Sequence, residues 1–317
     1  MGKSFVCFDI GGTFIKYAMI DEHGTIYEKG KMQTSIQNQR KEILHRICET
    51  IRKLEKNYAI HSVGISSCGL IDHERGEVIF SANIPGYSGT KIANYIYRET
   101  GYTAIVENDV RSACIGEMWK GAGIGKENIV LITLGTGIGS GIIINGQMLQ
   151  GANGLAGELG HMTIVHNGEE CSCGGKGCYE RYASTSALIR QYKEVSLSKG
   201  VCIETITGEE IIERINSGEQ LAKDVYEQFL QYVVTGLVNI THMFNPELII
   251  IGGGIAEQGE SFLKQIQERF QQTIMDIYQK KTNIVLAALH NDAGMYGACY
   301  LALNRWKNAH LNANLKM

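Results

Sequence analysis

A duplicated strand, glycine turn and strand is the feature that most limits how this 317-residue chain can fold. Residues 5–30 read as strand, Gly-rich turn, strand, turn and strand, and residues 129–151 read the same way. At one constant offset Gly11 aligns with Gly135, and most apolar positions around the first turn align with apolar positions around the second. Two apolar runs joined by a glycine turn are typical of a hairpin. A similar hairpin near the start of each half predicts two similar domains.

The rest of each half alternates strands with helices, which predicts mixed α/β domains. Apolar residues at helical spacing predict helices over 39–57, 184–194, 221–244 and 291–304, and a further helix begins near Asp109. Buried strands are expected over 61–67, 103–108 and 246–251. The polar tail, residues 307–317, is expected to fray.

The composition is typical of a soluble globular protein rather than a disordered one. Hydrophobic residues make up 44% and charged residues 20%, and the net charge of −3 lacks the basic excess of a nucleic-acid-binding protein. No apolar stretch approaches the roughly 20 residues that span a bilayer, and no secretory signal is visible. We therefore expect a cytoplasmic protein with no membrane or nucleic-acid partner. In that compartment its nine cysteines should be thiols or metal ligands rather than disulfides.

Three glycine turns follow β-like runs, over residues 9–13, 134–141 and 250–254. Glycine lets backbone N–H groups approach an anion closely. Each turn alone is equally well explained as a tight hairpin connection, but three together favour a phosphate-binding site. The candidate phosphate-binding residues are Gly11, Gly12, Thr13, Gly135, Thr136, Gly137, Gly253 and Gly254. Lys16, just after the first turn, either faces phosphate or is an ordinary surface lysine.

A compact set of thiols lies in "CSCGGKGC", residues 171–178. Together with His161, the residues Cys171, Cys173 and Cys178 give one imidazole and three thiolates, a composition typical of a closed structural zinc site. The alternative is a loop of unligated cysteines. Such a site has no open position for substrate, so the zinc is expected to position neighbouring side chains rather than to perform the chemistry.

Asp109 lies between an expected strand and an expected helix. A carboxylate near a helix N-terminus is stabilised as the anion and could serve as a general base for phosphoryl transfer. The alternative is that Asp109 only caps the helix.

The motifs "DIGGT", "END", "GTGIG", "GELGH" and "CSCGGKGCYER" occur in an order that resembles the ROK family of sugar kinases and related repressors. The resemblance covers essentially the whole chain. It implies a two-domain actin-like ATPase fold, as in the hexokinase superfamily, with a cleft between the domains. We expect one domain over 1–119, to which a C-terminal helix near 294–317 returns, and a second over 120–293 that carries the zinc loop.

The resemblance also implies residue roles. Asp109 would be the general base, and Asp9 would lie near the Mg²⁺ and phosphates of ATP, although it could be only a turn residue. The implied sugar-binding residues are Gly69, Asn83, Asn108, Asp109, Glu158, His161 and Glu180. The zinc loop would hold Glu180 toward the sugar and so shape the sugar site, although Glu180 could instead simply start a helix. Cys68 stands where the family has proline, which leaves that wall of the sugar pocket open to question.

The leading functional hypothesis is ATP-dependent phosphorylation of the 6-hydroxyl of a hexose, with glucose first. The alternative is an N-acetylmannosamine or other N-acetylhexosamine kinase, and a non-catalytic sugar sensor ranks below both. A repressor is not expected, because only eight residues precede Asp9 and leave no room for a DNA-binding module. By the same resemblance we expect a homodimer.

Overall fold

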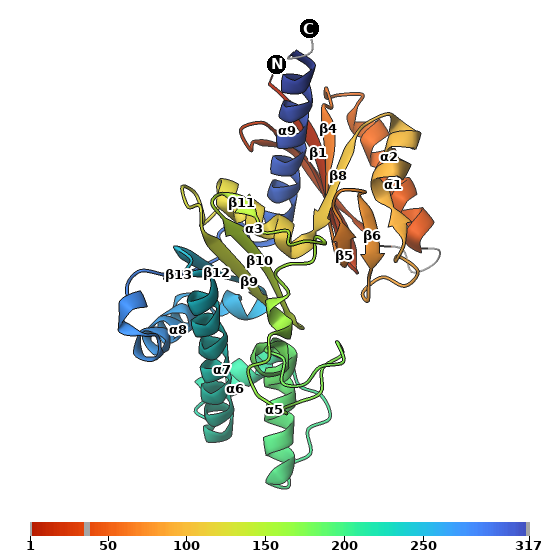
Figure 1. The fold of residues 1–317 in the computed structure, drawn as a ribbon. Helices are drawn as coiled ribbons and strands as arrows, with labels where there is room; N and C mark the ends of the chain where they lie inside the picture. The colour runs from red at the N-terminus through yellow and green to blue at the C-terminus, as the bar shows by residue number, and fades with distance from the viewer. Residues whose placement is uncertain (1, 35–38, 315–317) are drawn as a thin grey trace. The chain divides into compact units, whose positions relative to one another are not determined.

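The computed structural model describes residues 2–34 and 39–314 and divides into two compact units (Figure 1). The first consists of Met1–Gly125, Gln147–Ala156 and Ala288–Met317, and the second of Lys126–Gly146 and Gly157–Ala287. Residues 147–156 therefore group with the first unit, although they lie inside the range expected for the second domain.

The first unit is built on a five-stranded sheet in the order β3-β2-β1-β4-β8. Strands β1, β4 and β8 are parallel, whereas β2 and β3 are antiparallel to their neighbours. A small antiparallel sheet, β5-β6-β7, follows β4 in the chain. The elements are β1 (Ser4–Ile10), β2 (Phe14–Asp21), β3 (Ile26–Gln33), α1 (Gln39–Leu54), β4 (Ser62–Ser67), β5 (Leu70–Asp72), β6 (Glu77–Phe80), β7 (Thr90–Lys91), α2 (Ile92–Thr100), β8 (Ala104–Asn108), α3 (Asp109–Lys120), β11 (Gln147–Met148) and α9 (Ala293–Asn314).

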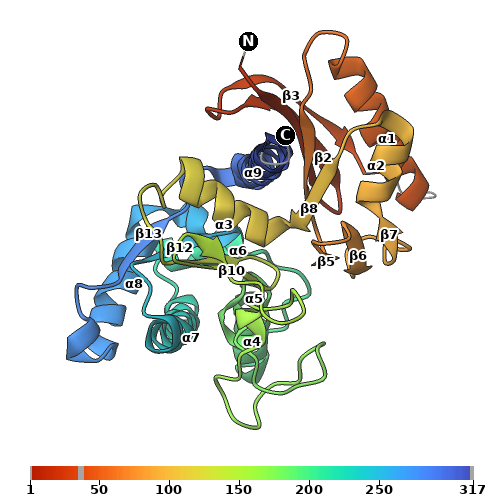
Figure 2. The ribbon, with the colours of Figure 1, turned by 45° about the horizontal axis from the view of Figure 1, so that its top comes forward.

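Strand β1 is apolar at almost every position because both faces of its sheet are covered. Val6, Phe8 and Ile10 pack with α1 and α2 on one face. Phe5 and Cys7 point to the other face and pack with α9. Figure 2 shows α1 and α2 on one side of β2 and β8, with α9 on the other. The carboxyl ends of β1, β4 and β8 are left at one edge of the sheet, where ligand sites of open α/β sheets form.

The second unit repeats this topology. Its five-stranded sheet has the order β11-β10-β9-β12-β13, which matches β3-β2-β1-β4-β8 strand for strand, so the short strand β11 pairs with β10 although its residues group with the first unit. The β10–β9 pair is antiparallel and the next two pairs are parallel, as in the first sheet. The two hairpins and the α/β class predicted from the sequence are confirmed. The elements are β9 (Ile129–Leu134), β10 (Ile138–Ile144), α4 (Glu180–Ala183), α5 (Thr185–Ser198), α6 (Gly208–Asn216), α7 (Gln220–Phe244), β12 (Leu248–Gly252), α8 (Glu260–Thr273) and β13 (Asn283–Leu286).

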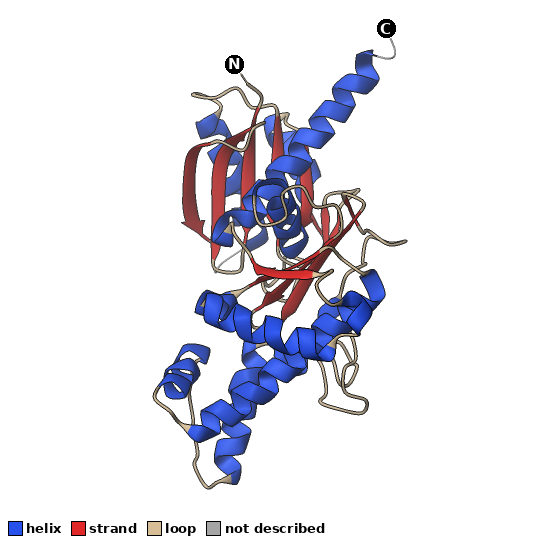
Figure 3. Ribbon diagram, turned by 90° about the vertical axis from the view of Figure 1, so that its left-hand side faces the viewer, coloured by secondary structure: helices blue, strands red, loops and turns tan. Residues whose placement is uncertain are grey.

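One sequence prediction is wrong. The tail from Lys307 was expected to fray, but α9 continues as one helix to Asn314 (Figure 3). The ring of Trp306 lies 5.5 Å from that of His61 and 4.1 Å from that of His310, one helical turn further on. These ring contacts help to stabilise the last turns of the helix around Trp306 and His310. Residues 315–317 lie outside the described part of the chain. None of the described helices has the length and apolarity that a membrane span requires.

Candidate active site

Asp109 is the first residue of α3, directly after β8. The helix is capped by Asn108, whose side-chain oxygen accepts hydrogen bonds from the backbone N–H groups of Val110 at 3.0 Å and Arg111 at 3.1 Å. The capping alternative for Asp109 is therefore wrong, because its neighbour performs that role. Oδ1 of Asp109 accepts from Val110 N and from the Asn108 amide, both at 2.9 Å.

The surroundings of Asp109 keep its proton affinity high for a carboxyl group. Burial raises the pKa of Asp109 to about 6, and the negative charge of Asp9 adds to this. The hydrogen bonds from Val110 and Asn108 favour the anion and limit the rise of the pKa. The group is therefore an anion near neutral pH but a stronger base than an exposed aspartate, which suits a proton acceptor.

Asp9 is the second-to-last residue of β1 rather than part of the following turn. Its Oδ1 accepts a 2.8 Å hydrogen bond from Ser66 Oγ, on the parallel strand β4. Its Oδ2 lies 3.5 Å from Lys16 Nζ, which also donates to the backbone oxygen of Asn291 at 3.1 Å. Lys16 is therefore partnered with Asp9 rather than an isolated surface lysine. Ser66 was missed by sequence reasoning, since nothing local marks it as facing Asp9.

The first glycine turn is held by its own backbone. Gly11 N donates to Phe14 O at 3.0 Å, and Thr34 N donates to Thr13 O at 2.9 Å. A Cβ on Gly12 would lie 3.5 Å from the backbone oxygen of Asn83. The structure thus brings Asn83, a predicted sugar contact, close to the turn predicted to bind phosphate.

Gly69 is joined to Asn108, because the Asn108 amide donates to Gly69 O at 3.0 Å. Gly69 has a φ of +103°, and a Cβ there would collide with the backbone oxygen of Phe80, so only glycine fits. The neighbouring Cys68 is buried, and its N–H donates to Ile10 O at 3.1 Å. Burial, followed by the charge of Asp109, raises the pKa of the Cys68 thiol to about 11, so the thiol stays neutral.

In the second unit, the two remaining glycine turns lie against each other. Gly135 N donates to Gly137 O at 3.0 Å between β9 and β10. Gly253 follows β12 with a φ of +87°, and a Cβ there would lie 2.5 Å from Leu134 O. Gly254, next to it, begins a short 3₁₀ segment. Thr136 lies at the tip of the β9–β10 turn. The structure therefore groups the phosphate-binding candidates of this unit at one edge of its sheet.

The four predicted metal ligands are also brought together. The ligand atoms of His161, Cys171, Cys173 and Cys178 all lie within 4.8 Å of one another. Cys173 Sγ is 3.6 Å from Cys178 Sγ, and Cys171 Sγ is 3.7 Å from His161 Nδ1. A tetrahedral zinc ion with Zn–S bonds of about 2.3 Å holds two sulfurs about 3.8 Å apart. The spacing of these side chains therefore fits such an ion.

Glu180 lies beside this cluster. Its Oε1 is 3.2 Å from Cys171 Sγ and 3.7 Å from His161 Nδ1. The preceding Tyr179 is fully buried and donates from its hydroxyl to Val233 O on α7 at 2.8 Å. Glu180 does begin α4, but it is also fixed between the thiols and a buried anchor.

Glu180 also approaches the glycine turn of its unit, since a Cβ on Gly137 would lie 2.7 Å from its Oε2. Glu158 precedes the 3₁₀ turn Leu159–His161, and its backbone oxygen accepts from His161 N at 3.1 Å. Glu158 and His161 are therefore one turn apart, as their spacing in the sequence predicted, and the turn is 3₁₀ rather than α-helical.

Comparison with known proteins adds to this geometry. The ROK family model matches residues 5–305. The chain is 33% identical over 305 residues to a glucokinase of Thermotoga maritima, a match that covers 94% of this chain and 96% of the relative.

Among solved structures, a ROK family glucokinase from Streptomyces griseus in complex with glucose and AMPPNP has a TM-score of 0.78 and 31% identity, covering 95% of this chain and 99% of that one. A Listeria monocytogenes protein proposed to be an N-acetylmannosamine kinase has a TM-score of 0.81 and 28% identity, covering 95% and 99%.

Proposed function

Because the chain belongs to the ROK family, we propose that this ATP-dependent sugar kinase phosphorylates the 6-hydroxyl of a hexose and prefers glucose. The glucokinase relatives support the substrate class. The observation that carries the proposal is Asp109, a carboxylate at the start of α3 with a pKa of about 6 and a neighbouring second carboxylate, Asp9.

In this proposal Asp109 accepts the proton of the sugar hydroxyl as that oxygen attacks the γ-phosphorus of ATP. Val110 N and the Asn108 amide hold Oδ1 in place, which leaves Oδ2 to receive the proton. The bond between the γ-phosphorus and the bridging oxygen breaks, and ADP leaves with that electron pair. Gly69, Asn83 and Asn108 would contact the sugar from the first unit.

Asp9 would hold Mg²⁺, directly or through a bound water. When bound with ATP, this ion neutralises charge on the phosphates. The residues fit this role, since carboxylate oxygen is a preferred Mg²⁺ ligand and Ser66 fixes the orientation of the group. Lys16 then lies where it can add positive charge near the same phosphates. The glycine turns at residues 11–13, 135–137 and 253–254 would bind ATP phosphates through backbone N–H groups.

The zinc site would act on the sugar indirectly. Three cysteines and His161 fit a closed tetrahedral site, and Glu180 lies against two of these four side chains. His161 would hold the zinc through one ring nitrogen, which would leave the other available to a sugar hydroxyl. Glu158 and Glu180 would accept hydrogen bonds from further hydroxyls.

A second candidate, an N-acetylmannosamine kinase, is favoured by one observation, the similarity to the Listeria protein. The same base and zinc loop would serve that substrate. ADP release with MgATP should be compared for glucose, N-acetylmannosamine, N-acetylglucosamine, mannose, fructose and no sugar. The largest kcat/KM with glucose supports the first proposal, and the largest with N-acetylmannosamine supports the second. No release above the sugar-free rate with any of them contradicts both.

A further inference from the structure

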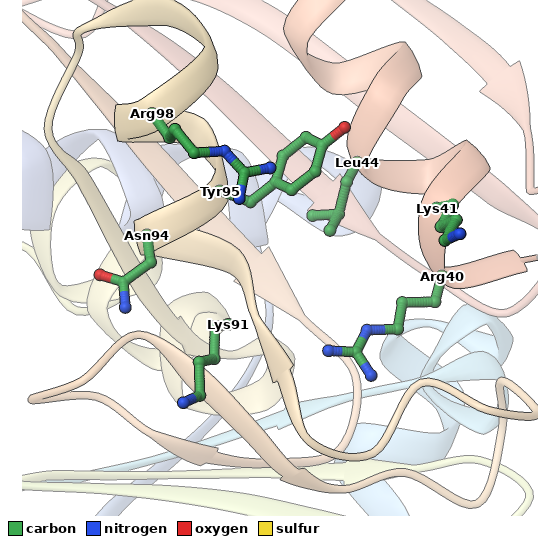
Figure 4. A pocket seen from close by; sticks show the side chains of 7 residues that line it. All are labelled: Arg40, Lys41, Leu44, Lys91, Asn94, Tyr95 and Arg98. Atoms are coloured by element: carbon green, nitrogen blue, oxygen red, sulfur yellow. The ribbon is translucent and has the colours of Figure 1, made fainter.

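A surface hollow lies between α1 and α2 of the first unit, with a volume of about 500 Å³. Figure 4 shows Arg40, Lys41 and Leu44 on α1 opposite Asn94, Tyr95 and Arg98 on α2, with Lys91 at the end of β7. None of these seven residues belongs to the proposed sugar, ATP or zinc sites. The volume lies within the range of small-molecule sites.

The charge of this hollow is one-sided. Four of its seven lining residues are cationic, and no carboxylate is among them, although the chain as a whole carries a net charge of −3. Arg98 pairs with its neighbour Glu99 at 3.1 Å. Within residues 2–34 and 39–314, no carboxylate lies within ion-pair distance of Arg40, Lys41 or Lys91. Arg40 and Lys41 are therefore available to an anion, whereas Lys91 lies opposite Glu77 on the paired strand β6 and also lines an adjoining hollow with Glu74 and Glu77.

Two of the cations are held in place rather than freely solvated. Arg40 Nη2 donates to Gly89 O at 3.0 Å, which fixes one arm of its guanidinium group. The Arg98 guanidinium lies 5.0 Å from the centre of the Tyr95 ring. Leu44 is buried beneath and gives the hollow an apolar floor. Fixed guanidinium groups suit phosphate oxygens, and an aromatic ring with an apolar floor suits the carbon face of a sugar.

We propose that this hollow binds a small phosphorylated sugar. Arg40, Lys41 and Lys91 would bind the phosphate, and the Asn94 amide would bind hydroxyl groups. The sugar carbons would lie against Tyr95 and Leu44. The site is chemically distinct from the proposed active site, because four of its seven lining residues are cations.

The hollow is connected to the proposed sugar contacts through one small sheet. Lys91 ends β7, and β7 pairs with β6, which pairs with β5. Strand β5 begins directly after Gly69, and the chain between β6 and β7 carries Asn83. Arg40 is bonded to Gly89, immediately before β7. Ligand binding therefore acts on the segment that carries Gly69 and Asn83, and it should change the KM for the sugar. This regulatory part rests on the proposed function.

The test is isothermal titration calorimetry of the full chain with glucose 6-phosphate and with inorganic phosphate, each in the presence of saturating glucose to fill the active site. We expect glucose 6-phosphate to bind at one site per chain and more tightly than inorganic phosphate. The double variant R40Q/K91Q should weaken this binding by about tenfold or more, since it removes two charge-assisted contacts. Lys53→Gln, an exposed lysine on the same helix, is the matched control and should change it less than about twofold.

Kinetics test the regulatory part separately. Because glucose 6-phosphate is also the product of the proposed reaction and can compete with the sugar at the active site, some shift of the KM is expected in every variant. The shift of the KM for the sugar should be larger in the wild type and in the Lys53 variant than in R40Q/K91Q. Binding that is absent, or equal in wild type and R40Q/K91Q, overturns the site. Equal affinity for inorganic phosphate and glucose 6-phosphate overturns the sugar phosphate as ligand. If the chain phosphorylates no sugar but still loses binding in R40Q/K91Q, the site stands and the proposed function fails.

Discussion

Ser66 and Asp9 face each other on parallel strands, and the Ser66 hydroxyl donates a 2.8 Å hydrogen bond to Oδ1 of Asp9. Ser66 is fully buried, so this bond is shielded from water. It turns the carboxylate so that Oδ2 is directed toward Lys16, 3.5 Å away. The orientation of the proposed Mg²⁺-binding group is thus fixed by a residue with no charge of its own.

Replacing Ser66 by alanine should weaken the response to Mg²⁺. A hydrogen bond to a charged group contributes roughly 1.5–3 kcal/mol, so we expect kcat/KM for MgATP to fall by about 10- to 100-fold. Rates measured across Mg²⁺ concentrations should show a higher Mg²⁺ requirement. Ser67→Ala is the control, because the Ser67 hydroxyl lies 3.1 Å from the Tyr87 hydroxyl and not beside Asp9. Equal Mg²⁺ profiles for the two variants would argue against the role of Ser66.

Asp109→Asn should remove the base while preserving the shape of the site. Asparagine retains an oxygen that can accept from Val110 N. We expect kcat to fall by about 10²–10⁴-fold, whereas the dissociation constant for the sugar changes only a few-fold. Asp72→Asn, which alters a carboxylate paired with exposed Arg75, is the control and should keep its activity. Turnover of the Asp109 variant near the wild-type rate would contradict the assignment of Asp109 as the general base.

Acidity should affect activity and stability in opposite directions through Asp109. Its folded pKa of about 6 lies above its unfolded value of about 3.9, so the folded state binds this proton more tightly. The resulting contribution to stability is complete below about pH 4 and is lost as the pH rises through about 6. Activity requires the anion, so kcat/KM for the sugar should fall as the pH drops through about 6.

The Asp109→Asn variant isolates the stability effect. We expect the free energy of unfolding of the variant, minus that of the wild type, to be about 1–3 kcal/mol larger at pH 8 than at pH 4. Denaturant unfolding at the two pH values measures this difference. The same stability difference at both pH values would contradict a raised pKa for Asp109.

Local patterns made much of this architecture predictable. The hairpins around Gly11 and Gly135 combine continuous apolar runs with glycine turns, and this pattern is compatible with few structures other than a hairpin. The proximity of Cys171, Cys173 and Cys178 could be anticipated because they are close in sequence, and only His161 had to be brought from further away.

Contacts between distant segments could not be predicted in the same way. Ser66 lies opposite Asp9 only because β1 pairs with β4 in one particular register. Arg40 and Lys91 share a hollow only because α1 and α2 cover the same face of the sheet. The chain alone gives no signal for either juxtaposition, since each depends on strand order and helix packing.

Cys173→Ser tests the metal site. Loss of one thiolate from a four-coordinate zinc site should reduce bound zinc, measured by elemental analysis, from about one per chain to a small fraction. Sugar affinity should fall more than ATP affinity, because Glu180 and His161 lose their support. Cys202→Ser, an exposed cysteine outside the cluster, should leave both unchanged. Full zinc content in the Cys173 variant, or an equal loss of sugar and ATP affinity, would contradict the proposed arrangement.

Gly69→Ala probes the wall of the proposed sugar pocket. The φ of +103° strains any other residue, and the added Cβ also collides with Phe80 O, so the β5–β6 segment must shift. Gly101→Ala is the matched control, with a φ of +76° and no atom within 4 Å of the added Cβ. We expect the control to lose about 1 kcal/mol of unfolding free energy and Gly69→Ala to lose about 3 kcal/mol, as measured by denaturant unfolding. The KM for the sugar should rise only in the Gly69 variant, since Gly69 O is the acceptor for the Asn108 amide. An unchanged KM for the sugar in a folded Gly69→Ala protein would contradict a role for Gly69 in the sugar site.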